Sequence, residues 1–218
     1  MVASYTDGGG SVESISSAAT TAIANVNDAP GGSVVISGTP TQGQILTATS
    51  TLTDLDGIPA SGSGAITYQW LADGQSIAGA GGSSLALTQA QVGKAISVRA
   101  AYTDLLGSAE SVISAATRAV ANVNDAPSAQ PASISLGEDS VRTGSLSATD
   151  IDGDSLKFSR VSGPAHGSVS INADGSFSYA PNSDFNGTDS FTFKVNDGLL
   201  DSVSATVSVL VTPVNDPP

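Results

Sequence analysis

A short string of residues recurs along this chain. Ala-Asn-Val-Asn-Asp-Ala-Pro occupies positions 24–30 and again 121–127, and a related string, Pro-Val-Asn-Asp-Pro-Pro, occupies positions 213–218. When residues 1–30 are aligned without a gap on residues 98–127, about 20 of the 30 positions are identical. Similarity at a fixed spacing is the signature of a repeat protein, so the chain is expected to be a row of similar structural units.

The recurring string divides the sequence into three segments. Residues 1–24 are predicted to be the C-terminal hairpin fragment of a preceding repeat, and residues 25–123 and 124–218 to be two full repeats. A domain of this size is near the lower limit for a self-sufficient hydrophobic core. The sequence has no cysteine, which excludes disulfides and cysteine-based zinc sites as additional stabilisation. Bound calcium is the expected replacement.

Apolar residues in both full repeats follow the two-residue period of half-buried strands, and helical periodicity is confined to a possible turn at 88–92. The residues that alternate in this way are Ile66, Tyr68 and Trp70; Ile96, Val98, Ala100 and Tyr102; Phe191, Phe193 and Val195; and Val203, Ala205, Val207, Val209 and Val211. Turn signals separate the strands at 72–75, 172–175 and 196–198. The predicted fold class is all-β, with two tandem antiparallel β-sandwich domains after the hairpin fragment.

Acidic residues gather in two loops of each full repeat. They are Asp54, Asp56 and Asp104 in the first repeat, and Asp150, Asp152, Asp154 and Asp197 in the second. In a sandwich, these loops lie at the end where the chain enters the domain, so the entering linker is expected to meet them. The linker residues concerned are Asn25, Asn27 and Asp28, and Asn122, Asn124 and Asp125. Because calcium takes about six to eight oxygen ligands, each set predicts a calcium site.

These residues resemble the cadherin family, in particular the cadherin-like tandem repeats of large bacterial surface adhesins exported by type I secretion. The second repeat carries the resemblance in segments 137–139, 147–154, 164–167 and 184–191. The first repeat is more similar to the Ig-like companion repeat of the same adhesins, through Tyr68-Gln69-Trp70, Asp73-Gly74, Val92-Gly93-Lys94 and Ala101-Tyr102-Thr103-Asp104. The resemblance implies Ig-like and cadherin-like sandwiches, calcium as the cofactor, and an extracellular location at the bacterial cell surface.

The resemblance also implies a glutamate near the first strand that serves a calcium site at the opposite end of the domain. Glu138 matches that position, and its partners in the next linker would be Asn215 and Asp216. The corresponding position of the first repeat is Gln42, so that repeat offers no matching acid. The linker is one residue shorter than the cadherin form and lacks its second Asn, which favours one calcium ion over a cluster.

Simpler explanations exist for several of these residues. Asp-x-Asp-Gly forms turns without any metal. A calcium loop of the EF-hand type is not expected to begin at Asp150, because Val161 stands where a bidentate Glu is required. His166, the only histidine, is expected to be a turn residue. The Asn186-Gly187-Thr188 sequon also fits a turn. The sequence contains none of the common nucleophile, phosphate-loop or dinucleotide motifs, so an enzyme is not expected.

Charge narrows the range of partners. Seven Lys and Arg against 20 Asp and Glu give a formal charge of −13, which disfavours nucleic acid and anionic membrane surfaces and favours cations. The sequence also has no apolar run of the roughly 20 residues that span a bilayer. The preferred interpretation is a set of calcium-binding spacer repeats that extend an adhesin and contact neighbouring repeats of the same chain. The alternative is an adhesive module that binds a glycan or a protein directly.

Overall fold

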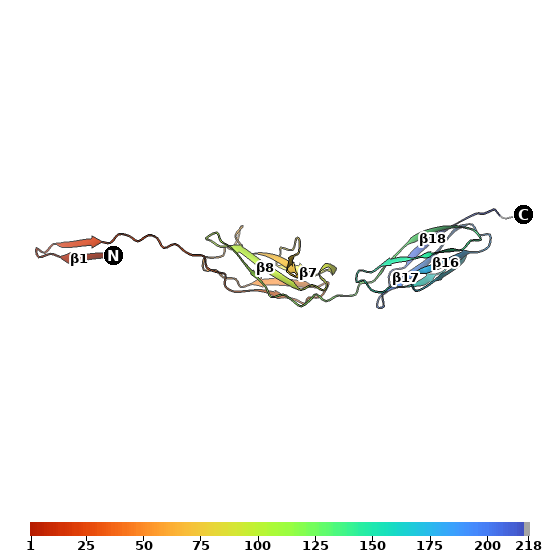
Figure 1. Cartoon of the computed structure of the whole chain (residues 1–218), viewed down its shortest axis with the longest axis horizontal. Coiled ribbons are helices and arrows are strands. Elements are labelled where there is room, and N and C mark those ends of the chain that lie inside the picture. Colours follow the sequence, from red (N-terminus) through yellow and green to blue (C-terminus); the bar gives the residue numbers. More distant parts are fainter. Residues whose placement is uncertain (216–218) are drawn as a thin grey trace. The chain divides into compact units, whose positions relative to one another are not determined.

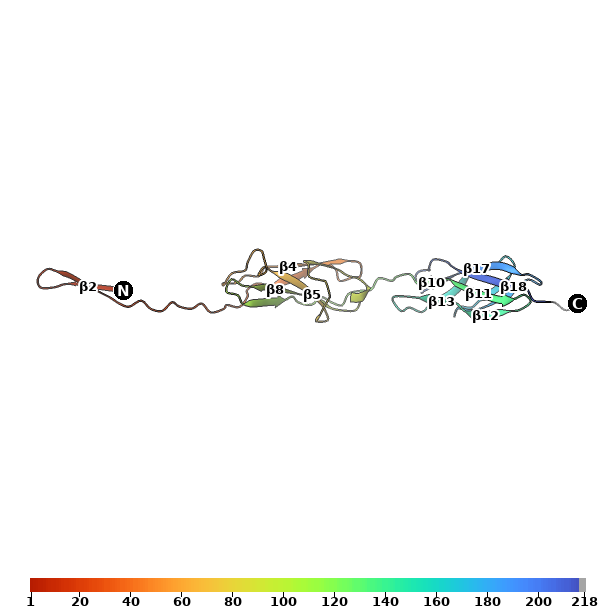
Figure 2. The same ribbon diagram turned by 90° about the horizontal axis from the view of Figure 1, so that it is seen from above.

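The computed structural model describes residues 1–215 and is built almost entirely of β-strands (Figures 1 and 2). The strands are β1 Val2–Thr6, β2 Val12–Ser16, β3 Val34–Ser37, β4 Ile45–Ser50, β5 Thr67–Ala72, β6 Gln75–Ser76, β7 Ser84–Ala86, β8 Ile96–Thr103, β9 Ala109–Ile113, β10 Ser128–Gln130, β11 Ala132–Gly137, β12 Arg142–Ser145, β13 Ser147–Thr149, β14 Lys157–Ser162, β15 Gly167–Ile171, β16 Ser176–Pro181, β17 Gly187–Asn196 and β18 Ala205–Thr212. A 3₁₀ turn, η1 Gln89–Gln91, lies within the segment 88–92 where a helical turn was predicted.

The chain forms two compact units. Unit 1 comprises residues 1–37, 47–83 and 97–116, and unit 2 comprises residues 38–46, 84–96 and 117 onward. The repeat boundaries proposed from the sequence, at 24/25 and 123/124, remain predictions.

Unit 1 contains an isolated hairpin and two further sheets. Strands β1 and β2 pair so that Tyr5 lies opposite Glu13, and β8 and β9 pair in the same register, with Tyr102 opposite Glu110. The four-stranded sheet has the order β6-β5-β8-β9, and the three-stranded sheet has the order β3-β4-β7. The two hairpins therefore repeat in structure what they repeat in sequence.

One face of each sheet of unit 1 is buried, as the alternation of the sequence predicts. The fully or nearly fully buried side chains are Val34, Ala48, Trp70, Leu71, Val98, Ala100 and Tyr102. Trp70 is the largest of them, and its Nε1–H donates a hydrogen bond of 2.9 Å to the Gly82 carbonyl, so its only polar atom is satisfied in the core. The turn at Asp73 and Gly74 joins β5 to β6 with positive φ at both positions, the geometry of a two-residue hairpin.

Unit 2 contains a sandwich of a four-stranded sheet, β11-β18-β17-β14, and a three-stranded sheet, β12-β16-β15, beside the small pair β10-β13. Both main sheets contribute to one core: Tyr179 of β16 is fully buried with Phe193 of β17 and Val207 of β18. The sheets are antiparallel except that β11 runs parallel to β18. This parallel pair joins the start and the end of the domain, so it needs no tight turn and the alternation of residues does not reveal it.

Two details of unit 2 differ from the predicted strands. Val203 was predicted to lie on the last strand, but β18 begins at Ala205 and Val203 is 89% exposed. The turn after β17 is also wider than the Asn-Asp-Gly signal suggests, because the ladder closes between Asn196 and Asp201. The hairpin at 172–175 forms as predicted, with Gly175 at a φ of 86°.

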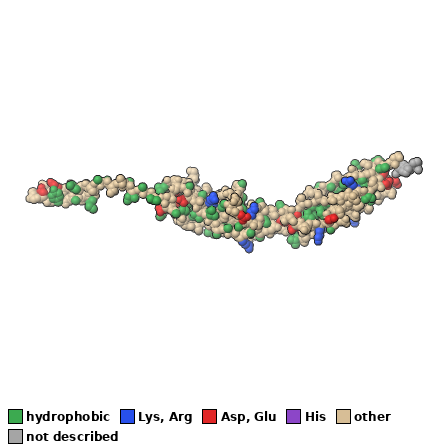
Figure 3. Space-filling model, in the orientation of Figure 1, with side chains coloured by type: hydrophobic (Ala, Val, Ile, Leu, Met, Phe, Trp, Pro, Cys, Tyr) green, Lys and Arg blue, Asp and Glu red, His purple; other side chains and the backbone are tan. Residues whose placement is uncertain are grey.

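The surface carries few charges. Most of the face in Figure 3 consists of backbone and uncharged polar side chains, in agreement with a sequence in which 12% of residues are charged. Within residues 1–215, no helix is long and apolar enough to cross a membrane.

Candidate metal centres

Three carboxylates meet in unit 1, as the sequence predicts. One oxygen each of Asp54, Asp56 and Asp104 lies within 4.8 Å of the other two. Asp56 and Asp104 are buried, and Asp54 is half-buried. Like charges at this separation repel by about 3 to 4 kcal/mol per pair at an effective dielectric constant near 20, so the arrangement favours a cation among them.

Local turn chemistry places these carboxylates. Asp54 Oδ1 accepts the backbone N–H of Asp56 at 2.8 Å, and the Asp54 carbonyl accepts the N–H of Gly57 at 3.1 Å. Gly57 has a φ of 88°, which a side chain rarely tolerates. The Leu105 N–H donates to the Gly57 carbonyl at 3.1 Å, and this bond ties the loop that begins at Asp104 to the Asp-x-Asp-Gly turn.

The entering linker contacts this cluster. The Asp28 N–H donates to Asp56 Oδ2 at 2.7 Å, and Asn25 Nδ2 donates to Asp56 Oδ1. Asn27 turns elsewhere and donates to Glu110 Oε1 at 2.7 Å. The structure therefore brings Asn25 and Asp28 to the predicted site, whereas Asn27 bonds Glu110, an acid that was not predicted as a site residue. Glu110 lies opposite Tyr102 in the pairing of β8 with β9. The register of that hairpin is therefore the feature that would have identified Glu110 as a neighbour of the predicted site.

One oxygen of this cluster has no partner. Asp104 is 4% exposed, and its Oδ1 accepts the N–H groups of Leu106 at 2.9 Å and Ser108 at 2.8 Å. Its Oδ2 is buried and makes no hydrogen bond. An unpaired buried carboxylate oxygen is costly, and a bound cation would satisfy it.

A tyrosine borders the same cluster. The Tyr102 hydroxyl donates to Asp54 Oδ2 at 2.5 Å. Burial raises the pKa of Tyr102, and the hydrogen bond to Asp54 with the negative charges of Asp54, Glu110 and Asp104 raises it further. The hydroxyl thus stays protonated and serves as a donor.

Unit 2 repeats the arrangement at Asp150, Asp152 and Asp154, whose ligand oxygens also lie within 4.8 Å of one another. Asp150 Oδ1 accepts the N–H of Asp152 at 2.8 Å and of Asp154 at 3.3 Å, and Asp150 Oδ2 is buried without a hydrogen-bond partner. Asp154 is exposed, so this cluster is more open than that of unit 1.

The second linker meets this loop in the same way. The Asp125 N–H donates to Asp152 Oδ2 at 2.7 Å, the distance found between Asp28 and Asp56. Hydrogen bonds from the Asp125 backbone, and then from the side chains of Asn122 and Gln89, lower the pKa of Asp152 against the opposing effects of burial and of the Asp197 charge. Asp152 is therefore held as a carboxylate.

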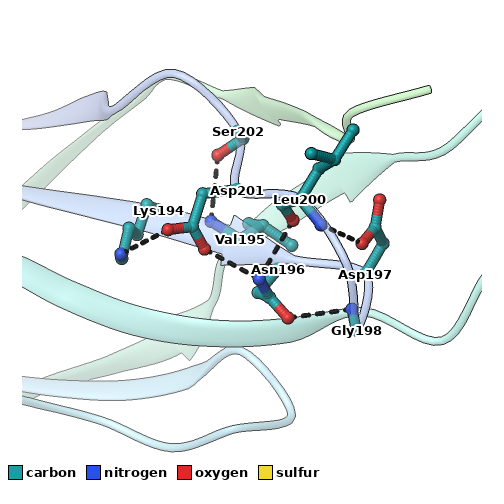
Figure 4. A network of polar contacts seen from close by, with 8 residues as sticks. All are labelled: Lys194, Val195, Asn196, Asp197, Gly198, Leu200, Asp201 and Ser202. Atoms are coloured by element: carbon teal, nitrogen blue, oxygen red, sulfur yellow. Dashed lines mark hydrogen bonds and ion pairs between the residues drawn. The ribbon is translucent and has the colours of Figure 1, made fainter. Parts of the chain in front are cut away.

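Asp197 lies in the loop after β17 (Figure 4). It does not belong to the group of three carboxylates. The N–H groups of Leu200 and Leu199 donate to its Oδ1, each at 2.7 Å, and Asn124 Nδ2 donates to its Oδ2 at 2.9 Å. These bonds lower the pKa of Asp197 in that order.

The base of this loop is braced by an ion pair. Lys194 Nζ lies 2.6 Å from Asp201 Oδ2, and Asn196 Nδ2 donates to the other Asp201 oxygen at 2.9 Å (Figure 4). Both charged side chains are substantially exposed, so the pair fixes the loop more than it stabilises the fold.

The predicted glutamate at the opposite end of unit 2 is buried. Glu138 Oε1 accepts the N–H of Val214 at 2.8 Å, and its Oε2 accepts Asn186 Nδ2 at 3.2 Å. This places the carboxylate beside the linker segment that continues into Asn215, and the shared calcium site of Glu138 and Asn215 stays a prediction. Asp216, its other predicted partner, lies outside the described residues.

Two glutamines near the second linker were not predicted as site residues. Gln42 Nε2 donates to Asp125 Oδ2 at 2.8 Å, and Gln89 Nε2 donates to Asp152 Oδ1 at 3.0 Å. In the sequence, Gln42 is notable only because it stands where the second repeat has an acid. A glutamine in a loop does not by itself indicate a metal site.

His166 lies in a bend before β15, as predicted, whereas the sequon residues Gly187 and Thr188 belong to strand β17 and not to the turn expected from the sequence. Asp189 braces the turn at His166: its two oxygens accept the N–H groups of Ala165 at 2.9 Å and His166 at 3.0 Å. The His166 ring stacks on Phe185 with a centroid separation of 4.4 Å.

Comparison with known proteins supports the cadherin-like character of the second repeat. Residues 124–213 match the sequence family described as "Bacterial cadherin-like domain". No curated protein matches the chain.

Several solved structures are similar to parts of this chain. Protocadherin Gamma B2 extracellular cadherin domains 3-6 are 13% identical with a TM-score of 0.42, and the match covers 86% of this chain and 51% of that one. An endo-fucoidan hydrolase of glycoside hydrolase family 107 is 15% identical with a TM-score of 0.36, and the match covers 99% of this chain and 34% of that one. Titin domains z1z2, solved in complex with telethonin, are 17% identical with a TM-score of 0.29, over 88% of this chain and 100% of that one. The chain thus spans about a third to a half of the length of the first two.

Proposed function

We propose that this chain is a set of calcium-binding spacer repeats of a bacterial cell-surface adhesin, in which calcium stiffens the linkers between domains. The observation that carries the proposal is the same in both units: three carboxylates lie within 4.8 Å of one another, and one buried oxygen, of Asp104 or Asp150, has no hydrogen-bond partner. The cadherin-like family match at 124–213 supports an extracellular location for these repeats.

Calcium suits these donors better than other ions. Every predicted ligand atom is an oxygen of an Asp, Asn or Glu side chain, which is the donor set of a hard cation. The chain has one histidine and no cysteine, so it lacks the donors that transition metals prefer. Magnesium demands a near-ideal octahedron, whereas calcium accepts the irregular geometry that two loops and a linker provide.

Linkage converts binding into stability. Calcium that binds the folded site and not the unfolded chain adds roughly 1.4 to 2.7 kcal/mol per site at a free concentration of about ten to a hundred times Kd. Extracellular modules bind calcium with Kd values of about 10⁻⁴ to 10⁻³ M. The linkers would then be pliant at low calcium and firm outside the cell.

The proposed role is mechanical, so neither catalysis nor a ligand is required of this segment. The linker residues Asn25 and Asp28, and Asn122 and Asp125, are bonded to the carboxylate loops, which supports a role for the metal in fixing the linkers. The alternative is direct binding of a glycan or protein. Among residues 1–215, no group of contacts comparable to the carboxylate clusters supports it.

Calcium titration of the melting temperature, with small-angle scattering of the same samples, tests the proposal. We expect millimolar calcium to raise the melting temperature and to narrow the distribution of molecular lengths. Asp152→Asn combined with Asp154→Asn should remove most of the contribution of the second site. An unchanged melting temperature and scattering profile would contradict the proposal, and binding on a glycan array would favour the alternative.

A further inference from the structure

Gln42 and Glu138 occupy the same position in successive repeats. The Gln42 N–H donates to the Ala121 carbonyl and the Glu138 N–H to the Thr212 carbonyl, each at 2.9 Å. Two residues further along each exit linker, a valine N–H donates to the side-chain Oε1: Val123 to Gln42 at 3.1 Å, and Val214 to Glu138 at 2.8 Å. At this shared position one repeat therefore carries a carboxamide where the next carries a carboxylate.

The carboxamide contacts the linker acid directly. Gln42 Nε2 donates to Asp125 Oδ2 at 2.8 Å. The orientation of this amide is fixed by its partners, because its oxygen accepts an N–H from Val123 and its nitrogen faces a carboxylate. A glutamate at position 42 would set a second negative charge against Asp125, and a bound cation or a shared proton would be needed to relieve the repulsion.

A second glutamine acts on the neighbouring loop. Gln89 Nε2, at the start of η1, donates to Asp152 Oδ1 at 3.0 Å and to the Ile151 carbonyl at 3.4 Å. Reversing this amide would place its oxygen against two other oxygens, so the donor orientation is again the favourable one without a metal. Amide N–H groups thus satisfy oxygens of both Asp125 and Asp152.

We propose that Gln42 and Gln89 form a metal-independent latch, in which carboxamide donors take the place of a cation and hold the linker at 122–125 to the loop at 150–154. The linker at this seam is ordered in the absence of calcium, and any ion that binds the Asp150 cluster adds stability without creating that order. Only the statements about calcium rest on the proposed calcium function; the amide contacts do not. The latch also lowers the calcium affinity of the site, because an ion must compete with two amides for Asp125 and Asp152.

Hydrogen exchange of the Val123 amide, measured by NMR on the whole chain in a chelator and in calcium, tests the latch. The wild-type amide should be protected equally in both conditions. Gln42→Ala should speed its exchange about tenfold, the effect of one lost hydrogen bond, and leave the Val214 amide unchanged. The Val214 amide is the internal control because Glu138 holds it in the same way.

Gln42→Glu is the decisive variant. It keeps an oxygen for Val123 but sets a carboxylate against Asp125, so protection of the linker should become dependent on calcium, and calcium affinity should rise. Val123 protection that appears only with calcium in the wild type, or that survives in Gln42→Ala, would overturn the latch.

The two proposals fail separately. If the wild type binds no calcium but Gln42→Ala exposes Val123 in chelator, the latch stands and the calcium function fails. Gln89→Ala offers a check that leaves Gln42 in place: it should raise calcium affinity by freeing Asp152, and unchanged or lower affinity would contradict its part in the latch. Burial of Trp70, followed by its fluorescence, reports whether each variant is folded.

Discussion

Asp7 and Asp104 occupy the same position in two copies of one turn, but only Asp104 is buried. Asp7 Oδ1 accepts the N–H groups of Gly9 and Ser11, each at 2.9 Å, as Asp104 Oδ1 accepts those of Leu106 and Ser108. Asp7 is exposed, whereas the second oxygen of Asp104 is buried beside Asp54 and Asp56 without a partner. The turn explains one oxygen of Asp104, and the cluster is needed to explain the other.

This pair gives a matched test of the metal site in unit 1. Asp104→Asn removes one of three mutually repelling charges, so we expect the metal-free variant to be more stable than the metal-free wild type by about 1 to 2 kcal/mol. The variant should also lose the increase in melting temperature that calcium binding at this site produces. Asp7→Asn alters the same turn without a cluster and should change neither quantity. Thermal melts in chelator and in calcium measure both; a full calcium response in Asp104→Asn would rule out this residue as a ligand.

Acid should weaken the fold in the absence of calcium. The pKa of Asp152 is lowered chiefly by the Asp125 N–H, and the pKa of Asp197 chiefly by the Leu200 N–H. The unfolded chain, with ordinary aspartate pKa values near 3.9, takes up these protons first, so the stabilising contribution is present above about pH 4 and is lost as the pH falls through the lower folded values. The melting temperature measured in chelator should therefore decrease at pH values below about 4.

Asp197→Asn identifies the source of this acid dependence. The variant removes one of the groups with a lowered pKa, so its melting temperature should vary less with pH in that range. The exposed hairpin acid Asp7 provides the control substitution, Asp7→Asn. If the melting temperature of Asp197→Asn decreases with falling pH as steeply as that of the wild type, the Asp197 carboxylate does not contribute to the acid dependence of stability.

Tyr102 offers a second matched pair with the hairpin. Its hydroxyl donates to Asp54, and Tyr102→Phe leaves Asp54 Oδ2 without this donor; we expect a loss of about 1.5 to 3 kcal/mol, as for hydrogen bonds to charged groups. Tyr5→Phe removes the corresponding hydroxyl, which bonds Glu13 in the exposed hairpin, and should cost little. Denaturant unfolding in chelator compares the two, and equal effects would argue against a structural role for the Asp54 contact.

The same hydroxyl predicts an alkaline limit. Burial and neighbouring carboxylates raise the pKa of Tyr102, and burial with the Asp189 hydrogen bond raises that of Tyr179. Their contribution to stability is present below the ordinary tyrosine pKa near 10 and is lost as the pH rises toward the folded values. Ultraviolet titration should show these two tyrosines ionising only as the protein unfolds; early ionisation of both in the folded protein would contradict the prediction.

Much of this structure follows from local pattern in the sequence. The alternation at Trp70, Val98 and Phe193 predicts buried strand faces because one face of each sheet must leave water. The Asp-x-Asp-Gly turns predict both carboxylate groups, because acids within one short turn, or in that turn and an adjacent loop, lie close together in the fold. Each of these inferences depends on neighbours in the chain.

The features that the sequence does not reveal depend on contacts between distant residues. The parallel pairing of β11 with β18 joins segments separated by most of a domain. Asn27 selects Glu110, 83 positions away, because β9 brings that acid to the linker. Gln42 and Asp125 are also separated by 83 positions in the sequence. The role of the Gln42 amide can be recognised only when the carboxylate that it contacts is known.

The two Asp-x-Asp-Gly glycines should respond differently to alanine. Gly57 and Gly153 have similar positive φ values, 88° and 80°, so Gly→Ala strains the backbone by about 1 to 2 kcal/mol at either site. A Cβ on Gly57 would also lie 2.8 Å from Leu105 Cδ1, whereas one on Gly153 would meet nothing within 4 Å. Since Leu105 follows Asp104, Gly57→Ala should displace that carboxylate and weaken calcium binding in unit 1, beyond the loss of stability shared with Gly153→Ala. Calorimetric titration of both variants with calcium measures this difference; equal affinities at the two sites relative to wild type would show that the Leu105 contact does not position Asp104.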